Sequence, residues 1–143
     1  MGISDRMRDD LNSARRERDK LRTLVLSTTL SEAKNRQIEL GRELTDEDFT
    51  EIVGRALKKR RESSEQYRAA SRPELAEREE QEAALLTAYL PEQLGEEQVR
   101  AYVREAVAAG AASVGAVMAA VMPKVKGRFD GKETNRIVRE ELG

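Results

Sequence analysis

The residues best suited to binding chemistry lie near the C-terminus, in a basic, glycine-containing segment that leads into a helical pattern. Backbone N–H groups and the positive end of a helix can hold a phosphate group, and glycine lets such a group approach closely. Connections of this kind are common and this one is not a Walker loop, so the residues alone leave phosphate binding and a structural connection equally open. The candidate nucleic-acid-binding residues are Lys124, Lys126, Gly127, Arg128, Gly131, Lys132 and Arg136.

A denser group of cations runs from Arg55 to Arg61, with Lys58, Lys59 and Arg60 between them. At about 3.6 residues per turn, these side chains spread over more than one face of a helix and cannot all contact one ligand. Glutamates follow Lys58 and Arg61 at i,i+4 spacing, at positions 62 and 65. We therefore favour a solvated helix face over a phosphate site.

Arg60 is the exception in this cluster, because it falls on the apolar stripe of its helix. If the helices on either side of Ser71 form a hairpin, Glu79 and Glu82 come close to Arg60. An unpaired buried charge is costly, and an Arg–carboxylate pair would satisfy both partners. We predict a structural ion pair between Arg60 and these two glutamates.

The chain offers little for catalysis, because it contains no Cys and no His. This excludes thiolate nucleophiles, a Ser-His-Asp triad and the commonest metal ligand. Glutamates are dense between Glu74 and Glu82, but no Asp-x-Asp-x-Gly loop accompanies them. We expect no catalytic residue, no metal and no cofactor.

The charge balance argues against a generic polyanion binder. The 143 residues include 26 Lys and Arg and 27 Asp and Glu, which gives a net charge of −1, whereas such binders are strongly basic. Three Tyr and two Phe cannot form a broad base-stacking platform. No apolar run approaches the roughly 20 residues of a membrane span, and the N-terminus is no signal peptide. We expect a cytoplasmic protein with neither DNA nor a membrane as partner.

Apolar residues recur at three- and four-residue spacing almost throughout, which predicts an all-α fold. Capping side chains and prolines predict where the helices begin. The expected N-caps are Ser4, Thr45 with Asp48, Ser71 with Glu74, and Asp130 with Glu133. Two further helices should follow Asp19 and Ser113, and Gly95 stands where a serine N-cap would be expected. The predicted helices span about 5–17, 20–40, 46 to beyond 67, 72–90, 96–109, 114 to about 123, and 130–142.

Leu90-Pro91 is the best domain boundary in the chain, since proline ends a helix there. We predict a four-helix N-terminal domain over residues 1–90 that contains a long helical hairpin. A linker over 91–95 and a C-terminal three-helix bundle over 96–143 follow. Three short helices bury little surface, so this bundle should be marginally stable alone.

Several motifs resemble those of the GatB/YqeY family, in its YqeY-like branch. The C-terminal signature is carried by Met122-Pro123-Lys124-Val125-Lys126-Gly127-Arg128, Asp130-Gly131-Lys132 and Ile137-Val138. Lys34-Asn35, Lys58-Lys59-Arg60 and Tyr89-Leu90-Pro91 resemble the N-terminal part, so the likeness covers nearly the whole chain. Phe129 departs from the small residues familiar at its position, and we favour a core role for it over stacking on a ligand.

The resemblance implies a C-terminal unit like the tail domain of the B subunit of the glutamine-dependent aspartyl/glutamyl-tRNA amidotransferase, which helps to hold tRNA. It implies an accessory protein of tRNA-dependent amidation or translation that binds tRNA without catalysing. The alternative is a protein-interaction module that associates with an amidotransferase, a synthetase or a translation factor. An activity as a carbon–nitrogen ligase with glutamine as amido donor is implied only as a family label, since the chain lacks the residues for it.

Overall fold

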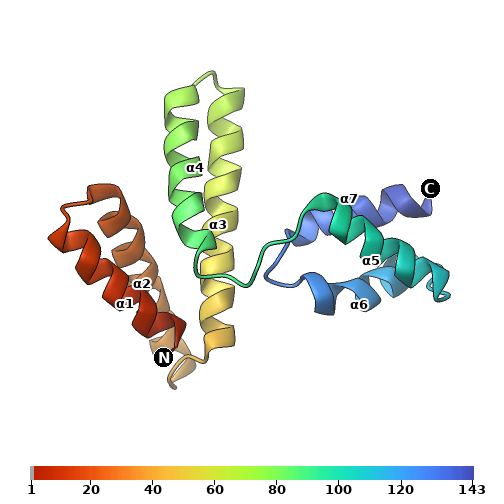
Figure 1. The fold of residues 1–143 in the computed structure, drawn as a ribbon, viewed down its shortest axis with the longest axis horizontal. Coiled ribbons are helices and arrows are strands. Elements are labelled where there is room, and N and C mark those ends of the chain that lie inside the picture. Colours follow the sequence, from red (N-terminus) through yellow and green to blue (C-terminus); the bar gives the residue numbers. More distant parts are fainter. Residues whose placement is uncertain (1) are drawn as a thin grey trace. The chain divides into compact units, whose positions relative to one another are not determined.

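The computed structural model describes residues 2–143, and these form seven α-helices with no strand (Figure 1). The all-α prediction is therefore confirmed. The helices are α1 (Ile3–Arg16), α2 (Lys20–Leu40), α3 (Asp46–Ala69), α4 (Pro73–Thr87), α5 (Glu96–Ala108), α6 (Val114–Val125) and α7 (Gly131–Leu142).

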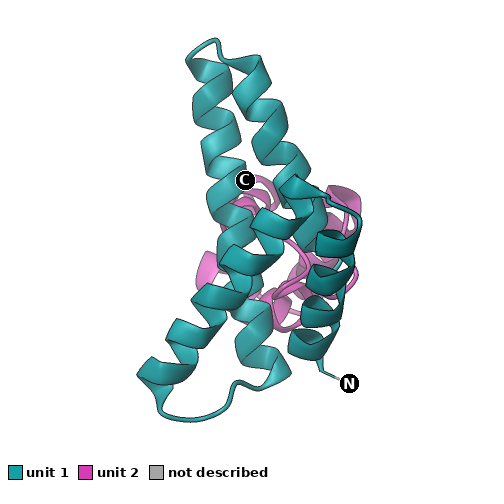
Figure 2. Ribbon diagram, turned by 90° about the vertical axis from the view of Figure 1, so that its left-hand side faces the viewer, with its two compact units in different colours: residues 1–90 teal, residues 91–143 magenta. Residues whose placement is uncertain are grey.

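The chain divides into two compact units, one ending at Leu90 and the other beginning at Pro91 (Figure 2). Each unit has its own cluster of buried apolar side chains. The first contains helices α1–α4 and the second contains α5–α7. We describe each unit by itself.

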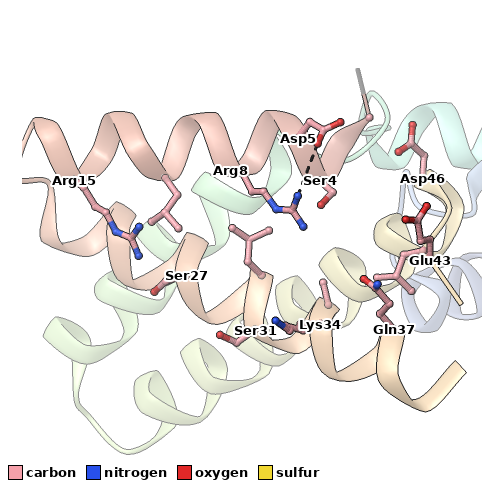
Figure 3. A pocket seen from close by; sticks show the side chains of 15 residues that line it. Ser4, Asp5, Arg8, Arg15, Ser27, Ser31, Lys34, Gln37, Glu43 and Asp46 are labelled. Atoms are coloured by element: carbon pink, nitrogen blue, oxygen red, sulfur yellow. Dashed lines mark ion pairs between the residues drawn. The ribbon is translucent and has the colours of Figure 1, made fainter. Parts of the chain in front are cut away.

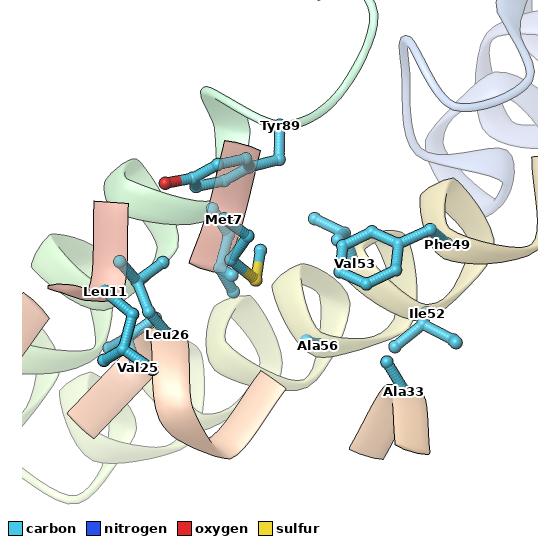
Figure 4. Packing of buried hydrophobic residues seen from close by; sticks show 11 residues of the cluster. Met7, Leu11, Val25, Leu26, Ala33, Phe49, Ile52, Val53, Ala56 and Tyr89 are labelled. Carbon is cyan, nitrogen blue, oxygen red and sulfur yellow. The ribbon is translucent and has the colours of Figure 1, made fainter. Parts of the chain in front are cut away.

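The first unit consists of two antiparallel helical hairpins, α1–α2 and the longer α3–α4 (Figure 1). Its core joins side chains from all four helices, among them Met7, Leu26, Phe49 and Leu86, each at most 1% exposed (Figure 4). Tyr89 completes this core after the end of α4, and its hydroxyl donates a hydrogen bond to Asp10. Both hairpins are therefore stabilised by one shared core.

The predicted caps at Thr45 and Asp130 are confirmed, and Asp19 and Ser113 cap the two helices that were expected to follow them. Asp19, Thr45, Ser113 and Asp130 each accept a hydrogen bond from the backbone N–H three residues later. The Thr45 cap is reciprocal, because the Asp48 carboxylate accepts from the Thr45 N–H at 3.0 Å. Such bonds satisfy backbone N–H groups that a helix start leaves without partners.

The predicted Ser71 cap is wrong, because Ser71 ends α3 instead of starting α4. Its φ is 59°, in the left-handed region. Arg72 N–H donates to the Tyr67 carbonyl at 2.8 Å and Ser71 N–H donates to the Arg68 carbonyl at 3.1 Å. These two bonds form a Schellman motif, in which the residue at C′ must be left-handed. Arg72 then occupies the N-cap position of α4 without a side-chain cap.

The predicted Ser4 cap is also wrong, because α1 begins earlier, at Ile3 with Gly2 as N-cap. The cap comes from a distant part of the chain: Asp46 Oδ1, at the start of α3, accepts from the Ile3 N–H at 3.1 Å. A Cβ on Gly2 would lie 2.9 Å from that oxygen. Glycine at position 2 therefore gives the Asp46 carboxylate room to reach α1.

In the second unit, the predicted linker over 91–95 belongs to the bundle. Leu94 is buried among Val99, Val103 and Ile137, and its N–H donates to the Arg128 carbonyl at 2.8 Å. Phe129 packs against the same core, in agreement with the structural role that we favoured for it. The apolar side chain at position 94 explains why this segment is ordered on the bundle.

Candidate nucleic-acid interface

The connection between α6 and α7 carries most of the candidate residues. Lys126 caps the C-terminus of α6, and Gly127 follows with a φ of 75°, which favours glycine. Asp130 starts α7, and its carboxylate accepts from the Glu133 N–H at 3.2 Å. A Cβ on Gly131 would meet nothing within 4 Å, so the fold itself requires glycine at 127 but not at 131.

Arg128 holds this connection in place. Its Nε donates to the Glu92 carbonyl at 3.0 Å and its Nη1 donates to the Lys124 carbonyl at 3.2 Å. Gln93 adds a bond from its Nε2 to the Gly127 carbonyl at 2.9 Å. The guanidinium of Arg128 therefore positions the loop, whereas the sequence suggested that it would contact a ligand.

Arg136 is committed to carboxylates of its own unit. Its guanidinium donates to Glu96 and Glu140 at 2.6 Å each and to Glu133 at 2.8 Å. Donating these hydrogen bonds raises the pKa of Arg136, and the bond to Glu96 contributes most. A guanidinium already engaged in this way is poorly placed to bind phosphate, so Arg136 is not available as a phosphate ligand in this structure.

Arg136 belongs to an ion network between α5 and α7 that the sequence analysis missed. Its central member is Arg100, which is 16% exposed at the side chain and pairs with Glu140 at 2.5 Å and Glu141 at 3.1 Å. The only sign of this network in the sequence is that oppositely charged residues recur at three- and four-residue spacing within the segments of α5 and α7. The network consists of Glu96, Arg100, Arg104, Glu133, Arg136, Glu140 and Glu141.

Three lysines remain on the surface of this region, and Lys124, Lys126 and Lys132 are all exposed. Lys124 Nζ lies 3.7 Å from Glu105 and 5.1 Å from the centre of the Tyr102 ring. Lys132 lies in the first turn of α7. The three lysines thus stand at the end of α6 and the start of α7, on either side of a connection whose shape is maintained by Arg128 and Gly127.

The basic cluster of α3 differs from its prediction in one respect. Within residues 2–143, no ion pair joins Lys58 to Glu62 or Arg61 to Glu65, although all four side chains are exposed. Exposed pairs gain little free energy and cost side-chain entropy, which explains why the spacing alone does not produce them. The side chains of Arg55, Lys58 and Lys59 remain solvated.

Arg60 lies near Glu79, but the predicted direct ion pair with Glu79 and Glu82 is not formed. In the part of the chain that the structure describes, no direct ion pair joins Arg60 to either glutamate; Nη1 donates to the Ala56 carbonyl at 3.0 Å and the buried Nε has no partner. Arg60 still lies close enough to lower the pKa of Glu79, but burial and the neighbouring Glu82 outweigh it, so that pKa is raised overall. Glu82 is itself only 9% exposed.

Among residues 2–143, no three acidic side chains are grouped so that they could hold a metal ion. No helix in this range is long and apolar enough to cross a membrane.

The chain resembles one known protein family over nearly its whole length. No curated protein matches the chain. Among protein families, the one described as Yqey-like protein matches residues 4–142. That match spans α1 through α7 and so includes both units and the lysine-bearing loop. The chain therefore belongs to the YqeY-like protein family.

Proposed function

We propose that the protein binds tRNA through its second unit, as a non-catalytic accessory protein of tRNA-dependent amidation or translation. One observation carries the proposal: Lys124, Lys126 and Lys132 are exposed around a loop whose conformation is held by Arg128 and Gly127. Because the loop backbone is already held, binding has to order only the lysine side chains and not the loop itself.

Phosphate groups are the part of tRNA that suits this surface. Lysine ammonium groups pair with phosphate as point charges, and such contacts position a nucleic acid without reading its bases. The one aromatic side chain of the loop, Phe129, packs against the core. Recognition of tRNA shape through its backbone therefore fits the loop better than stacking on unpaired bases.

The net charge of the chain limits this interaction to a local contact. With a charge of −1 overall, the protein has no long-range attraction for nucleic acid, and three lysines neutralise few phosphates. The salt dependence of tRNA affinity should accordingly be shallow, with a slope of about −0.7 to −0.9 for each phosphate contacted.

The test is a titration of the full chain against total tRNA at two salt concentrations, with duplex DNA as comparison. The Lys124→Ala/Lys126→Ala/Lys132→Ala variant should lose affinity for all tRNA species and show a flatter salt slope. The matched control is Arg55→Ala/Lys58→Ala/Lys59→Ala, which removes the same charge from α3. Arg136→Ala serves as a second control, because it disturbs the α5–α7 network and should affect stability more than tRNA affinity.

Equal loss in the lysine variant and the α3 control would contradict the proposal, as would equal affinity for tRNA and duplex DNA. Undetectable tRNA binding by the unmodified chain would also contradict it.

A further inference from the structure

The first unit contains a cavity of about 690 Å³ between α1 and α2 (Figure 3). Its lining residues belong to the N-terminal third of the sequence and include none of the residues proposed to contact tRNA. The segment that leads into α3 closes one end of it through Glu43 and Asp46. Its volume is within the range typical of small-molecule sites, roughly 300–1,000 Å³. The apolar side chains of Leu11, Leu30 and Ala33 also contribute to its lining.

Cations gather along this cavity from both helices. Arg8 and Arg15 lie about two turns apart on α1, and Lys34 comes from α2. Within residues 2–143 no hydrogen bond or ion pair engages the side chain of Arg15 or Lys34. Arg8 has one weak, exposed contact, 4.0 Å from Asp5. These charges are therefore available to an anion.

Hydroxyl groups lie among the cations. Ser27 and Ser31 project from α2 on the side that faces α1, next to Lys34. The Ser27 hydroxyl donates to the Leu24 carbonyl at 3.2 Å, which leaves its lone pairs free to accept. Arginine, lysine and serine side chains together are the donors that coordinate phosphate oxygens in proteins.

The charge changes along the length of the cavity. Figure 3 shows Arg15 and Ser27 at one end, Arg8, Ser31 and Lys34 in the middle, and Gln37, Glu43 and Asp46 at the other end. Asp46 is partly engaged by its bond to the Ile3 N–H. A ligand that fits the middle and the acidic end carries a phosphate against the middle cations and hydrogen-bond donors such as hydroxyls toward the carboxylates. None of the lining residues is aromatic, so nothing there would stack on a nucleobase.

We infer that this cavity binds a small sugar phosphate, with the phosphate against Arg8, Ser31 and Lys34 in the middle of the cavity and the sugar hydroxyls toward Glu43. This site is independent of the proposed tRNA contact, which lies in the other unit and uses different residues.

The experiment is an NMR titration of the full-length, isotope-labelled chain with ribose 5-phosphate, and in parallel with ribose and with inorganic phosphate. Backbone shifts should change around Arg8, Ser27, Ser31 and Lys34, and ribose 5-phosphate should bind at least about tenfold more tightly than either comparison probe, a difference of about 1.4 kcal/mol. Shifts outside the cavity, or inorganic phosphate binding as tightly as the sugar phosphate, would overturn the inference.

Variants separate the phosphate contacts from the sugar contacts. Arg8→Ala/Lys34→Ala should weaken ribose 5-phosphate binding by at least about tenfold, while Lys20→Ala/Arg72→Ala, which removes the same charge outside the cavity, should leave it within about twofold. Glu43→Gln should weaken ribose 5-phosphate but not inorganic phosphate, and so reduce the preference between them. An equal effect of both double variants would overturn the inference. All these positions are exposed, and circular dichroism checks that each variant is folded.

Discussion

At the residue scale, two non-glycine residues within 2–143 have left-handed backbone conformations: Arg18, with a φ of 57°, and Ser71, with a φ of 59°. Both are at the C′ position of a helix, where the turn to the next helix demands this conformation. The left-handed region costs an L-residue roughly 1–2 kcal/mol relative to the right-handed one, whereas glycine adopts it freely. Each hairpin of the first unit thus contains one strained turn residue.

Ser71→Gly should stabilise the first unit by about 1 kcal/mol, because it removes this strain without altering a buried contact. Urea unfolding followed by circular dichroism measures the difference. The matched control is Ser63→Gly within α3, which should destabilise by about 0.5 kcal/mol because glycine is the poorer helix former. A Ser71→Gly variant less stable than the unmodified protein would show that the serine side chain is required in the turn.

The raised pKa of Glu79 makes the stability of the first unit depend on pH. Burial raises its pKa, with a further contribution from the charge of Glu82. A carboxyl whose pKa is raised on folding contributes stability below its unfolded pKa, and this is lost as the pH rises through the folded value. The ionised Glu79 therefore lowers the free energy of unfolding at neutral pH, and protonation in acid removes this effect.

Glu79→Gln should improve stability relative to the unmodified chain more at pH 7 than at about pH 3, which lies below the ordinary glutamate pKa of about 4.3 and so protonates the carboxyl in the folded and unfolded chain. Unfolding free energies of both proteins at the two pH values provide the comparison. Glu77→Gln, an exposed position on the same helix, controls for the loss of one surface charge. A gain for Glu79→Gln that is the same at both pH values would contradict this account.

At the scale of elements, α1 and α3 are connected by the Asp46 cap. The carboxylate accepts from the Ile3 N–H while Asp46 is also the first residue of α3. Asp46→Ala should cost about 1 kcal/mol of stability, as other lost N-caps do, and should increase hydrogen exchange in the first turn of α1. Glu47→Ala, next along α3 and also exposed, should leave that exchange unchanged; equal effects of the two variants would contradict the assignment.

At the scale of the whole molecule, each unit buries its own core. Leu86 is fully buried in the first cluster, and the second cluster is built mainly from valines, such as Val99, Val103 and Val121. The ion network of α5 and α7 and the bonds of Arg128 and Gln93 add to this modest core. We therefore propose that the two units unfold as separate domains.

Leu86→Ala should destabilise the first unit by about 2–5 kcal/mol, since it leaves a cavity in a packed core. Amide exchange of residues 96–142 should stay at its native rate, because their core is separate. Hydrogen exchange of the intact chain, resolved by residue, measures both effects. Equal acceleration in both units would show that they unfold as one cooperative body.

The helical class and most helix starts follow from the sequence alone, because apolar spacing and side chains such as Asp19, Thr45 and Asp130 act within a few residues of where they stand. The sequence also contained the family motifs. It could not place Asp46 on α1 or reveal Ser71 as a left-handed turn residue, since both depend on how one helix meets another.

The candidate site likewise depends partly on local sequence and partly on how distant side chains pack. The sequence identified a basic loop, but charge type alone could not separate the exposed Lys132 from Arg136, whose guanidinium pairs with carboxylates of α5 and α7. Nor could it bring Arg15 and Lys34 to one cavity. Which cations are open to a ligand depends on side chains distant in sequence, and only the tertiary structure decides which of them come within a few ångströms of one another.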